Sequence, residues 1–346
     1  MSDGALQWYP DELGDGFSYA YFPIEENSGS TRATLIRYQP EKDPDALPCT
    51  TTPQRFNLLF LHGWNDYFFH KEFARFIASQ GGNFYACDLR RFGRSHQAKE
   101  IWGYIADLHD YTQEIDFARA YATAQSPVPF ILYGHSTGGL TAALWAGKNP
   151  QACAGLILNS PWLELQYQWP VRKITAPLLR LLAKRDPYKV IPNGPAGYYY
   201  RGKTGGNLAA GLSPTESDPQ SDPFFTTGWQ PNPRYWHIPT FPVRFGWLNA
   251  VFSGQAEVEN GLGITCPIIT FTSAQSSNFT SWNEKVLESD AVLSVEQIWK
   301  RVPQLGNNVL LRKLPGAIHD ILLSRAAVRQ LCYQSLTTWL ADLPLS

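Results

Sequence analysis

A serine at the centre of a short glycine-rich motif constrains the fold of this chain more than any other feature. The motif, Gly134-His135-Ser136-Thr137-Gly138, follows an apolar segment of strand length (129–133) and precedes a helix-like segment of small residues (139–147). A strand, a tight turn with serine at its apex and a helix together form a nucleophile elbow. Glycines two residues before and after the serine permit the strained, crowded turn. The alternative is a glycine-rich turn whose serine only caps a helix.

The rest of the chain alternates between strand-like and helix-like segments. Two opening strands, 17–24 and 33–38, are expected to form an antiparallel edge. Further strands are expected at 57–62, 83–88, 129–134, 154–159, 267–273 and 308–314, and helices at 67–79, 108–125, 138–148, 295–302 and 321–342. The strands are continuous apolar runs, which is typical of a sheet covered by helices on both faces. The pattern predicts an α/β fold with a mostly parallel, eight-stranded sheet.

Residues 161–264 interrupt this alternation. The segment is far longer than the connections that usually join core elements, and the sequence predicts one helix in it, at 169–184. We expect a core of residues 1–160 and 265–346, with residues 161–264 inserted as a cap, or lid. Most aromatic residues of the cap could simply pack its own small core, but some are expected to line an apolar pocket for an acyl group. These aromatic residues are Trp162, Tyr167, Trp169, Tyr198, Tyr199, Tyr200, Phe224, Phe225, Trp229, Tyr235, Trp236, Trp247 and Phe252.

A serine nucleophile needs a base, and the base needs an acid that orients it. After an elbow of this kind the partners follow in the order acid, then histidine. Only His237 and His319 come after the motif. His237 lies in an irregular, proline-rich stretch, whereas His319 follows the last predicted strand and a Pro315-Gly316 turn. His319 is therefore the expected base, against the alternative of a histidine on a surface loop.

The acid is less well defined by the sequence, because no carboxylate directly follows strand 267–273. Asp320 is disfavoured because a chain neighbour rarely turns back onto the imidazole. Ser294 begins a capping-box pattern that opens helix 295–302, which leaves Asp290 in the preceding loop. We favour Asp290, with Glu284 and Glu288 as alternatives; any of them could instead belong to a solvated loop.

The oxyanion of an acyl-transfer reaction needs two pre-aimed N–H donors. One is expected from the backbone of Thr137, directly after the serine. The second is expected from the loop after strand 57–62, where Gly63 allows the backbone to turn inward and presents the N–H of Trp64. No residue pattern indicates a metal site or a cofactor.

These motifs resemble those of the α/β-hydrolase superfamily and, within it, the monoglyceride lipase, lysophospholipase and serine aminopeptidase group. The resemblance covers residues 55–160 and 265–342. It rests on His62-Gly63, on residues 88–95 (Asp-Leu-Arg-Arg-Phe-Gly-Arg-Ser), on residues 134–139 and on residues 316–320 (Gly-Ala-Ile-His-Asp). Arg91-Phe92 departs from the Arg-Gly of the family pattern, and Asp290-Ala291-Val292-Leu293 resembles the acid motif displaced by an insertion. The resemblance implies an α/β-hydrolase fold with a Ser136–Asp290–His319 triad.

Composition limits the classes of function. The chain has 346 residues, 44% of them hydrophobic, and a formal net charge of −1, which argues against nucleic acid as the main partner. No secretory signal and no apolar run of membrane-spanning length is apparent. The five cysteines are widely spaced and indicate small buried residues in a reducing compartment, so we expect a cytoplasmic protein. The oligomeric state is not indicated.

The expected function is hydrolysis of small carboxylic esters with an apolar acyl or aryl group, such as monoacylglycerol-like or lysophospholipid-like esters, through an acyl-enzyme. One alternative is an aminopeptidase, which would need a carboxylate in the cap for the ammonium group of its substrate. The cap has ten Lys and Arg against seven Asp and Glu, which does not favour this. The other alternative is a non-catalytic relative that binds a ligand.

Overall fold

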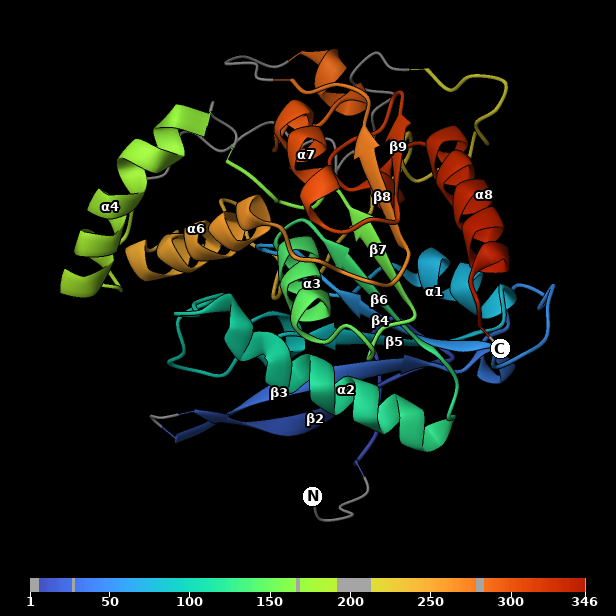
Figure 1. Cartoon of the computed structure of the whole chain (residues 1–346). Helices are drawn as coiled ribbons and strands as arrows, with labels where there is room; N and C mark the ends of the chain where they lie inside the picture. Colours follow the sequence, from blue (N-terminus) through green and yellow to red (C-terminus); the bar gives the residue numbers. More distant parts are fainter. Residues whose placement is uncertain (1–5, 27–28, 166–168, 192–212, 278–282, 346) are drawn as a thin grey trace.

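The computed structural model describes residues 6–26, 29–165, 169–191, 213–277 and 283–345 (Figure 1). A nine-stranded sheet runs through it in the order β1-β2-β3-β5-β4-β6-β7-β8-β9. The strands are β1 (Tyr9–Pro10), β2 (Phe17–Glu26), β3 (Gly29–Tyr38), β4 (Phe56–Leu61), β5 (Gly82–Asp88), β6 (Phe130–His135), β7 (Gly155–Asn159), β8 (Ile268–Ser273) and β9 (Val309–Leu314). The antiparallel edge and the parallel centre are as expected. The ninth strand is β1, which is only two residues long and too short to give a sequence pattern.

Seven α-helices are defined within the described residues. They are α1 (Lys71–Ser79), α2 (Thr112–Gln125), α3 (Thr137–Lys148), α4 (Trp169–Arg185), α6 (Phe245–Asn260), α7 (Val295–Arg301) and α8 (Ala326–Asp342). Three of them begin later than the sequence predicts. Tyr67 and Phe68 are buried before α1, and the Phe68 N–H donates to Asp88 instead of entering a helix. Short 3₁₀ turns, Leu108–Tyr111 and Ile321–Leu323, precede α2 and α8.

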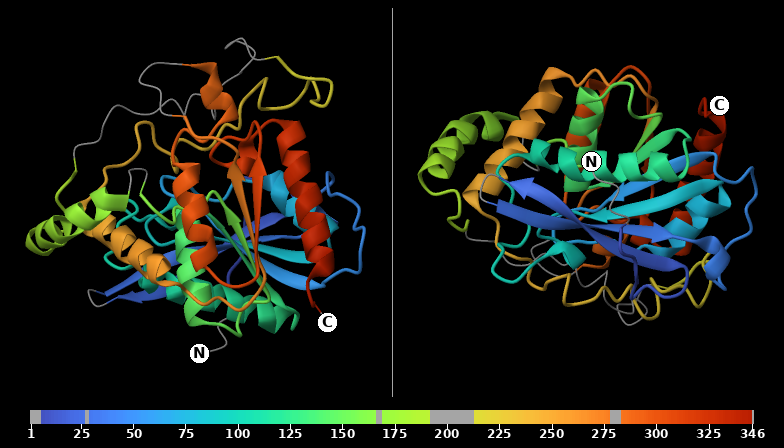
Figure 2. Two further views of the ribbon diagram at one scale, coloured as in Figure 1. Left: turned by 45° about the horizontal axis from the view of Figure 1, so that its top comes forward. Right: turned by 90° about the horizontal axis from the view of Figure 1, so that it is seen from below.

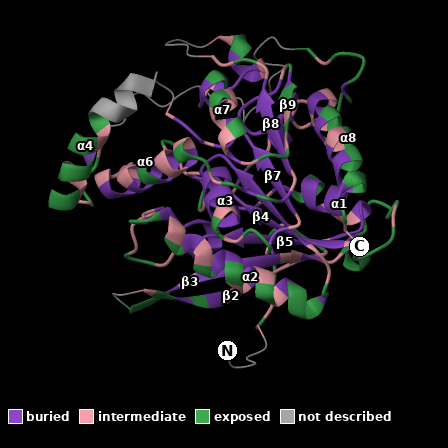
Figure 3. Ribbon diagram, in the orientation of Figure 1, coloured by how far each residue is buried: buried purple, intermediate pink, exposed green. Residues whose placement is uncertain are grey.

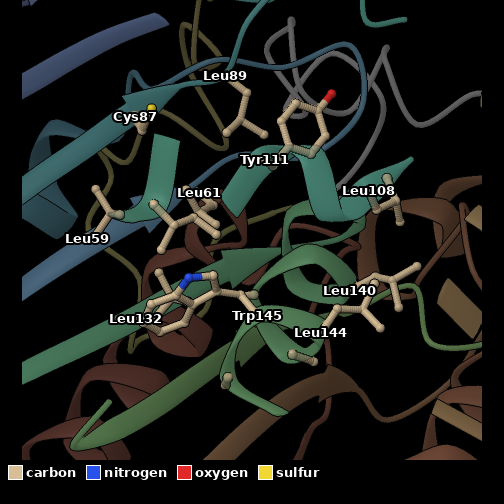
Figure 4. Close-up of a cluster of buried hydrophobic side chains, with 14 of the residues drawn as sticks. Leu59, Leu61, Cys87, Leu89, Leu108, Tyr111, Leu132, Leu140, Leu144 and Trp145 are labelled. Carbon is tan, nitrogen blue, oxygen red and sulfur yellow. The ribbon is translucent and has the colours of Figure 1, made fainter. Parts of the chain in front are cut away.

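The sheet has a hydrophobic core on each face. Alternate residues of β4 divide between them: Leu59 and Leu61 pack with residues of α2 and α3, whereas Leu58 and Phe60 pack with residues of α1 and α8. Figure 4 shows part of the first core, in which Leu140, Leu144 and Trp145 of α3 lie over the sheet. The central strands are almost entirely buried (Figure 3). Because both faces of these strands are buried, their sequences are continuous apolar runs.

The chain between β7 and β8 contributes α4 and α6, which lie on the opposite side of the molecule from α8 in every view (Figures 1 and 2). The helix expected at 169–184 is present as α4, while α6 was not predicted. Helix α6 packs against both α3 and α4. Four of the aromatic residues expected to help form the cap, Tyr167, Tyr198, Tyr199 and Tyr200, lie outside the described residues.

Among the helices of the described residues, none combines the length and the apolar composition needed to cross a bilayer. Four of the cysteines are buried as expected, but Cys49 is exposed, because it lies in the irregular connection before β4.

Candidate active site

Ser136 occupies the strained turn that its sequence motif predicts. Strand β6 ends at His135 and α3 begins at Thr137, so a single residue joins the two elements. Its backbone has φ of 53° and ψ of −117°, a conformation that L-residues rarely adopt. A Cβ atom at Gly134 would lie 2.5 Å from the carbonyl oxygen of Gly138, so the turn has no room for a side chain at this position.

Ser136, His319 and Asp290 form one hydrogen-bonded chain. The His319 Nε2 atom lies 3.1 Å from the Ser136 Oγ, and the His319 Nδ1 atom lies 2.9 Å from the Asp290 Oδ2. All three residues are buried, with exposed fractions of 8%, 3% and 0%. An ionised carboxylate can only accept, so Nδ1 carries the imidazole proton and Nε2 is left to accept from the serine hydroxyl. This arrangement can activate a serine nucleophile.

Backbone donors fix the orientation of the Asp290 carboxylate. Its Oδ1 atom accepts from the N–H groups of Val292 and Leu293 at 2.9 and 2.8 Å, which leaves Oδ2 to face His319. The other carboxylates considered from the sequence lie elsewhere. Glu284 is exposed, and Glu288 pairs with Arg325 at 3.3 Å.

Two other residues considered from the sequence also have different partners. Asp320 bonds to His70 and Asn159. The backbone N–H of His237, the other histidine after the motif, donates to Asn65, and its ring packs against Trp102. Neither residue takes part in the chain from Ser136 to Asp290.

The loop after β4 lies directly against the serine turn. A Cβ atom at Gly63 would be 3.0 Å from the Ser136 Cβ, and one at Gly138 would be only 2.2 Å from the carbonyl oxygen of His62. Residues 62–63 and 136–138 are therefore in close contact, as an oxyanion site built from the next residue, Trp64, and from Thr137 would require.

Residues 88–95, which carry part of the family resemblance, form a buried ion-pair cluster behind this loop. Arg94 bonds to Asp88 at 2.8 Å and to Asp11 at 2.7 Å. Arg90 pairs with Glu114 at 2.6 Å, and both side chains are almost fully buried. Several groups thus satisfy each buried charge, as burial requires. Residues 88–95 therefore have a structural part in the described residues: their ion pairs fix the loop after β5. They contribute no group to the hydrogen-bonded chain of Ser136, His319 and Asp290.

Aromatic side chains gather beside the oxyanion loop. The Trp64 ring centroid lies 3.8 Å from that of Trp247 on α6 and 4.5 Å from that of Phe241. The backbone N–H of Trp162 donates to the backbone oxygen of Ser136, and its ring centroid lies 5.9 Å from that of Trp247. Trp102 lies 5.9 Å from Phe241. We call Trp64, Trp102, Trp162, Phe241 and Trp247 the aromatic cluster; it combines residues of the core with residues of the insertion.

A second polar group, which no sequence pattern indicates, lies next to the serine turn. Atoms of Asp66, His135 and Asp320 that could ligate a metal lie within 4.8 Å of one another, and all three residues are buried. His70 joins this group through a 2.8 Å bond to Asp320. His135 ends strand β6, whereas Asp66 and Asp320 follow strands β4 and β9, so no spacing in the chain reveals that they meet.

Comparison with known proteins agrees with this geometry. The family model described as serine aminopeptidase, S33, matches residues 52–208, which include the oxyanion loop and the serine turn. The chain has the α/β-hydrolase fold. It resembles the group of monoglyceride lipases, lysophospholipases and serine aminopeptidases, as the motifs predicted.

The individual relatives match different shares of the chain. Phospholipase YtpA of Bacillus subtilis is 32% identical over 114 residues, which are 32% of this chain and 41% of that protein. A monoglyceride lipase of Saccharomyces cerevisiae has a TM-score of 0.60 at 19% identity, over 97% of this chain and 94% of that one. A carboxyl esterase of Bacillus coagulans has a TM-score of 0.59 at 14% identity, over 94% and 98%. At these identities the two structures show a shared fold.

Proposed function

We propose that the protein is a serine hydrolase that cleaves carboxylic esters through an acyl-enzyme. The observation that carries the proposal is the hydrogen-bonded chain from Ser136 through His319 to Asp290. A protein that only bound a ligand would have no need for a strained serine aligned with a base and a buried acid. The names of its relatives, which include lipases, esterases and a phospholipase, support the same class of reaction.

Each residue then has a defined part in the reaction. The Ser136 Oγ attacks the ester carbonyl while the Nε2 of His319 accepts its proton, and Asp290 stabilises the imidazolium that forms. The N–H groups of Trp64 and Thr137 bind the developing oxyanion. His319 gives the proton to the departing alcohol, leaving an acyl group on the serine. A water molecule, deprotonated by the same histidine, releases the acid product.

We propose that residues 161–264 act as a cap and that the aromatic cluster forms the wall of the acyl pocket. Three of its members, Trp162, Phe241 and Trp247, come from the insertion. The ring of Trp64, whose backbone N–H is a proposed oxyanion donor, packs against Trp247 and Phe241. Apolar walls with few polar groups are typical of small-molecule sites. The substrate class is therefore an ester whose acyl or aryl part is apolar.

An aminopeptidase is less well supported, because it would need a carboxylate for the ammonium group of its substrate. The buried carboxylates in the described part of residues 161–264 already pair with arginines. Glu164 bonds to Arg301, Asp218 to Arg325 and Asp222 to Arg329. A buried carboxylate engaged in this way is poorly suited to bind a further cation.

A chain-length series tests the proposal. The purified protein is assayed with p-nitrophenyl esters of increasing acyl length and, in parallel, with aminoacyl-nitroanilides. Each methylene that enters an apolar pocket contributes about 0.8 kcal/mol, so kcat/KM should rise about fourfold per carbon until the pocket is full.

The Trp247→Ala variant should alter the slope of this series, while an exposed control such as Leu331→Ala on α8 should leave it unchanged. A flat series, together with rapid cleavage of the nitroanilides and its loss on N-acetylation, would instead identify an aminopeptidase.

A further inference from the structure

A single carboxylate, that of Asp320, connects the loop of the base to the turn of the nucleophile. Its Oδ1 atom accepts from the side chain of Asn159 at 2.8 Å and from the Leu322 N–H at 3.1 Å. Its Oδ2 atom accepts from the His70 Nε2 at 2.8 Å. Asp320 has no exposed surface. It directly follows His319 in the chain, so these bonds also fix the backbone that carries the base.

Asn159, at the end of β7, completes the connection. Its side-chain oxygen accepts from the Ile321 N–H at 3.2 Å, while its backbone oxygen accepts from the Ser136 N–H at 3.0 Å. The same backbone oxygen lies 3.1 Å from the His135 Nδ1. One residue therefore holds the serine turn through its backbone and the base loop through its side chain.

The ring of His135 lies beside both groups. A carbonyl oxygen can only accept, so Nδ1, which faces the Asn159 oxygen, carries a proton. The Nε2 atom lies 3.9 Å from the Asp320 Oδ2, and Asp66 belongs to the same buried group. His135 therefore lies between the end of β7 and the Asp320 carboxylate.

We infer that Asp320 is a positioning residue of the reaction proposed above: with Asn159, it fixes the distance between the base His319 and Ser136. The ring centroids of His135 and His319 lie 5.0 Å apart, so a shift of either loop changes the geometry of the base. A displacement of about 1 Å at a reacting group costs on the order of 100-fold in rate. The inference rests on the proposed function for its effect on catalysis.

The Asp320→Asn variant tests the inference, because it removes the charge and keeps the shape. Asn retains an oxygen for the Asn159 and Leu322 donors. His70 has no hydrogen-bond partner at Nδ1 in the described structure, so it can move its proton there and accept at Nε2. We expect a folded protein whose kcat for a p-nitrophenyl ester falls by about 10- to 100-fold while KM changes by less than about twofold.

A matched control is Asp43→Asn, which also removes a buried carboxylate, in this case one paired with Arg75, at a position where the structure shows no bond to the site. Its kcat per folded molecule should equal that of the wild type. If kcat of Asp320→Asn, counted per folded molecule, also equals that of the wild type, the inference is overturned.

Histidine NMR gives a second readout that needs no substrate. In protein with ¹⁵N-labelled histidine, with signals assigned by a His319→Gln variant, the signal of the Nδ1 proton that His319 donates to Asp290 should shift or broaden in Asp320→Asn and stay unchanged in Asp43→Asn. An unchanged His319 signal in Asp320→Asn would overturn the inference. Failure of the wild type to cleave any ester would count against the proposed function and leave the NMR result to test the positioning.

Discussion

Replacing Asp290 with asparagine should nearly abolish activity while leaving the fold intact, and the structure explains why. Oδ1 of the carboxylate is held by the N–H groups of Val292 and Leu293. The asparagine oxygen must stay on these two donors, so its amide nitrogen must turn toward His319. Two donors cannot face each other, and the imidazole therefore moves its proton from Nδ1 to Nε2.

The consequence for catalysis is severe. With a proton on Nε2, His319 donates toward Ser136 instead of accepting from it, and the serine loses its base. In a related triad this exchange lowers kcat by about 10⁴-fold, which corresponds to about 5.5 kcal/mol of transition-state stabilisation. The new residue has the same volume, so the free energy of unfolding should change far less than the activation free energy.

The assay is kcat for a p-nitrophenyl ester, with circular dichroism and urea unfolding to show that each variant is folded. Glu284→Gln and Glu288→Gln are the matched controls, because each also exchanges a carboxylate for an amide in the same loop region. Both should stay within about threefold of the wild type, because neither carboxylate bonds to His319: Glu284 is exposed and Glu288 pairs with Arg325. A mild Asp290→Asn combined with a severe loss in either control would refute the assignment.

Two further predictions concern the backbone and the pH dependence of stability. The Gly138→Ala variant should lose about 100-fold or more in kcat/KM, measured on the same ester, because the added carbon would lie 2.2 Å from the His62 oxygen and must displace the oxyanion loop; activity near that of the wild type would contradict this. Hydrogen bonds from Arg75 lower the pKa of Asp43 from 3.8 to about 2. Asp43 should therefore stabilise the fold by on the order of 1 kcal/mol above about pH 4, and this should be lost as the pH falls toward 2. In urea unfolding the difference between wild type and Asp43→Asn should shrink between pH 6 and pH 3, and a constant difference would be the contrary result.

Much of the framework could be predicted from the sequence, because local patterns determine it. Central strands such as 57–62 and 129–134 are buried on both faces, so their apolar runs mark them within about one residue. The serine turn is equally local, since its glycines are required by contacts within or next to the turn. Helix starts were less predictable: residues before α1 are apolar enough to continue the helix pattern, yet tertiary bonds such as that from Phe68 to Asp88 take them out of it.

The parts that the sequence could not reveal depend on long-range contacts. The preference for Asp290 over Glu284 and Glu288 rested on a loop position, whereas the structure distinguishes them by burial and by the bond to His319. Helix α6 was missed because its small and aromatic residues lack a clear polar face; its role appears only when Trp247 packs on Trp64. The group around Asp320 was missed because its members are brought together by the sheet.

The most direct test of the account is covalent labelling of Ser136. A fluorophosphonate probe reacts with a serine only when a base activates it, and peptide mass spectrometry identifies the modified residue. The wild type should be labelled at Ser136, and Ser136→Ala should not be labelled. The His319→Gln variant should react far more slowly, because it lacks the imidazole Nε2 that lies 3.1 Å from the Ser136 Oγ and accepts its proton. Labelling at another serine, or an unlabelled but folded wild type, would contradict the account.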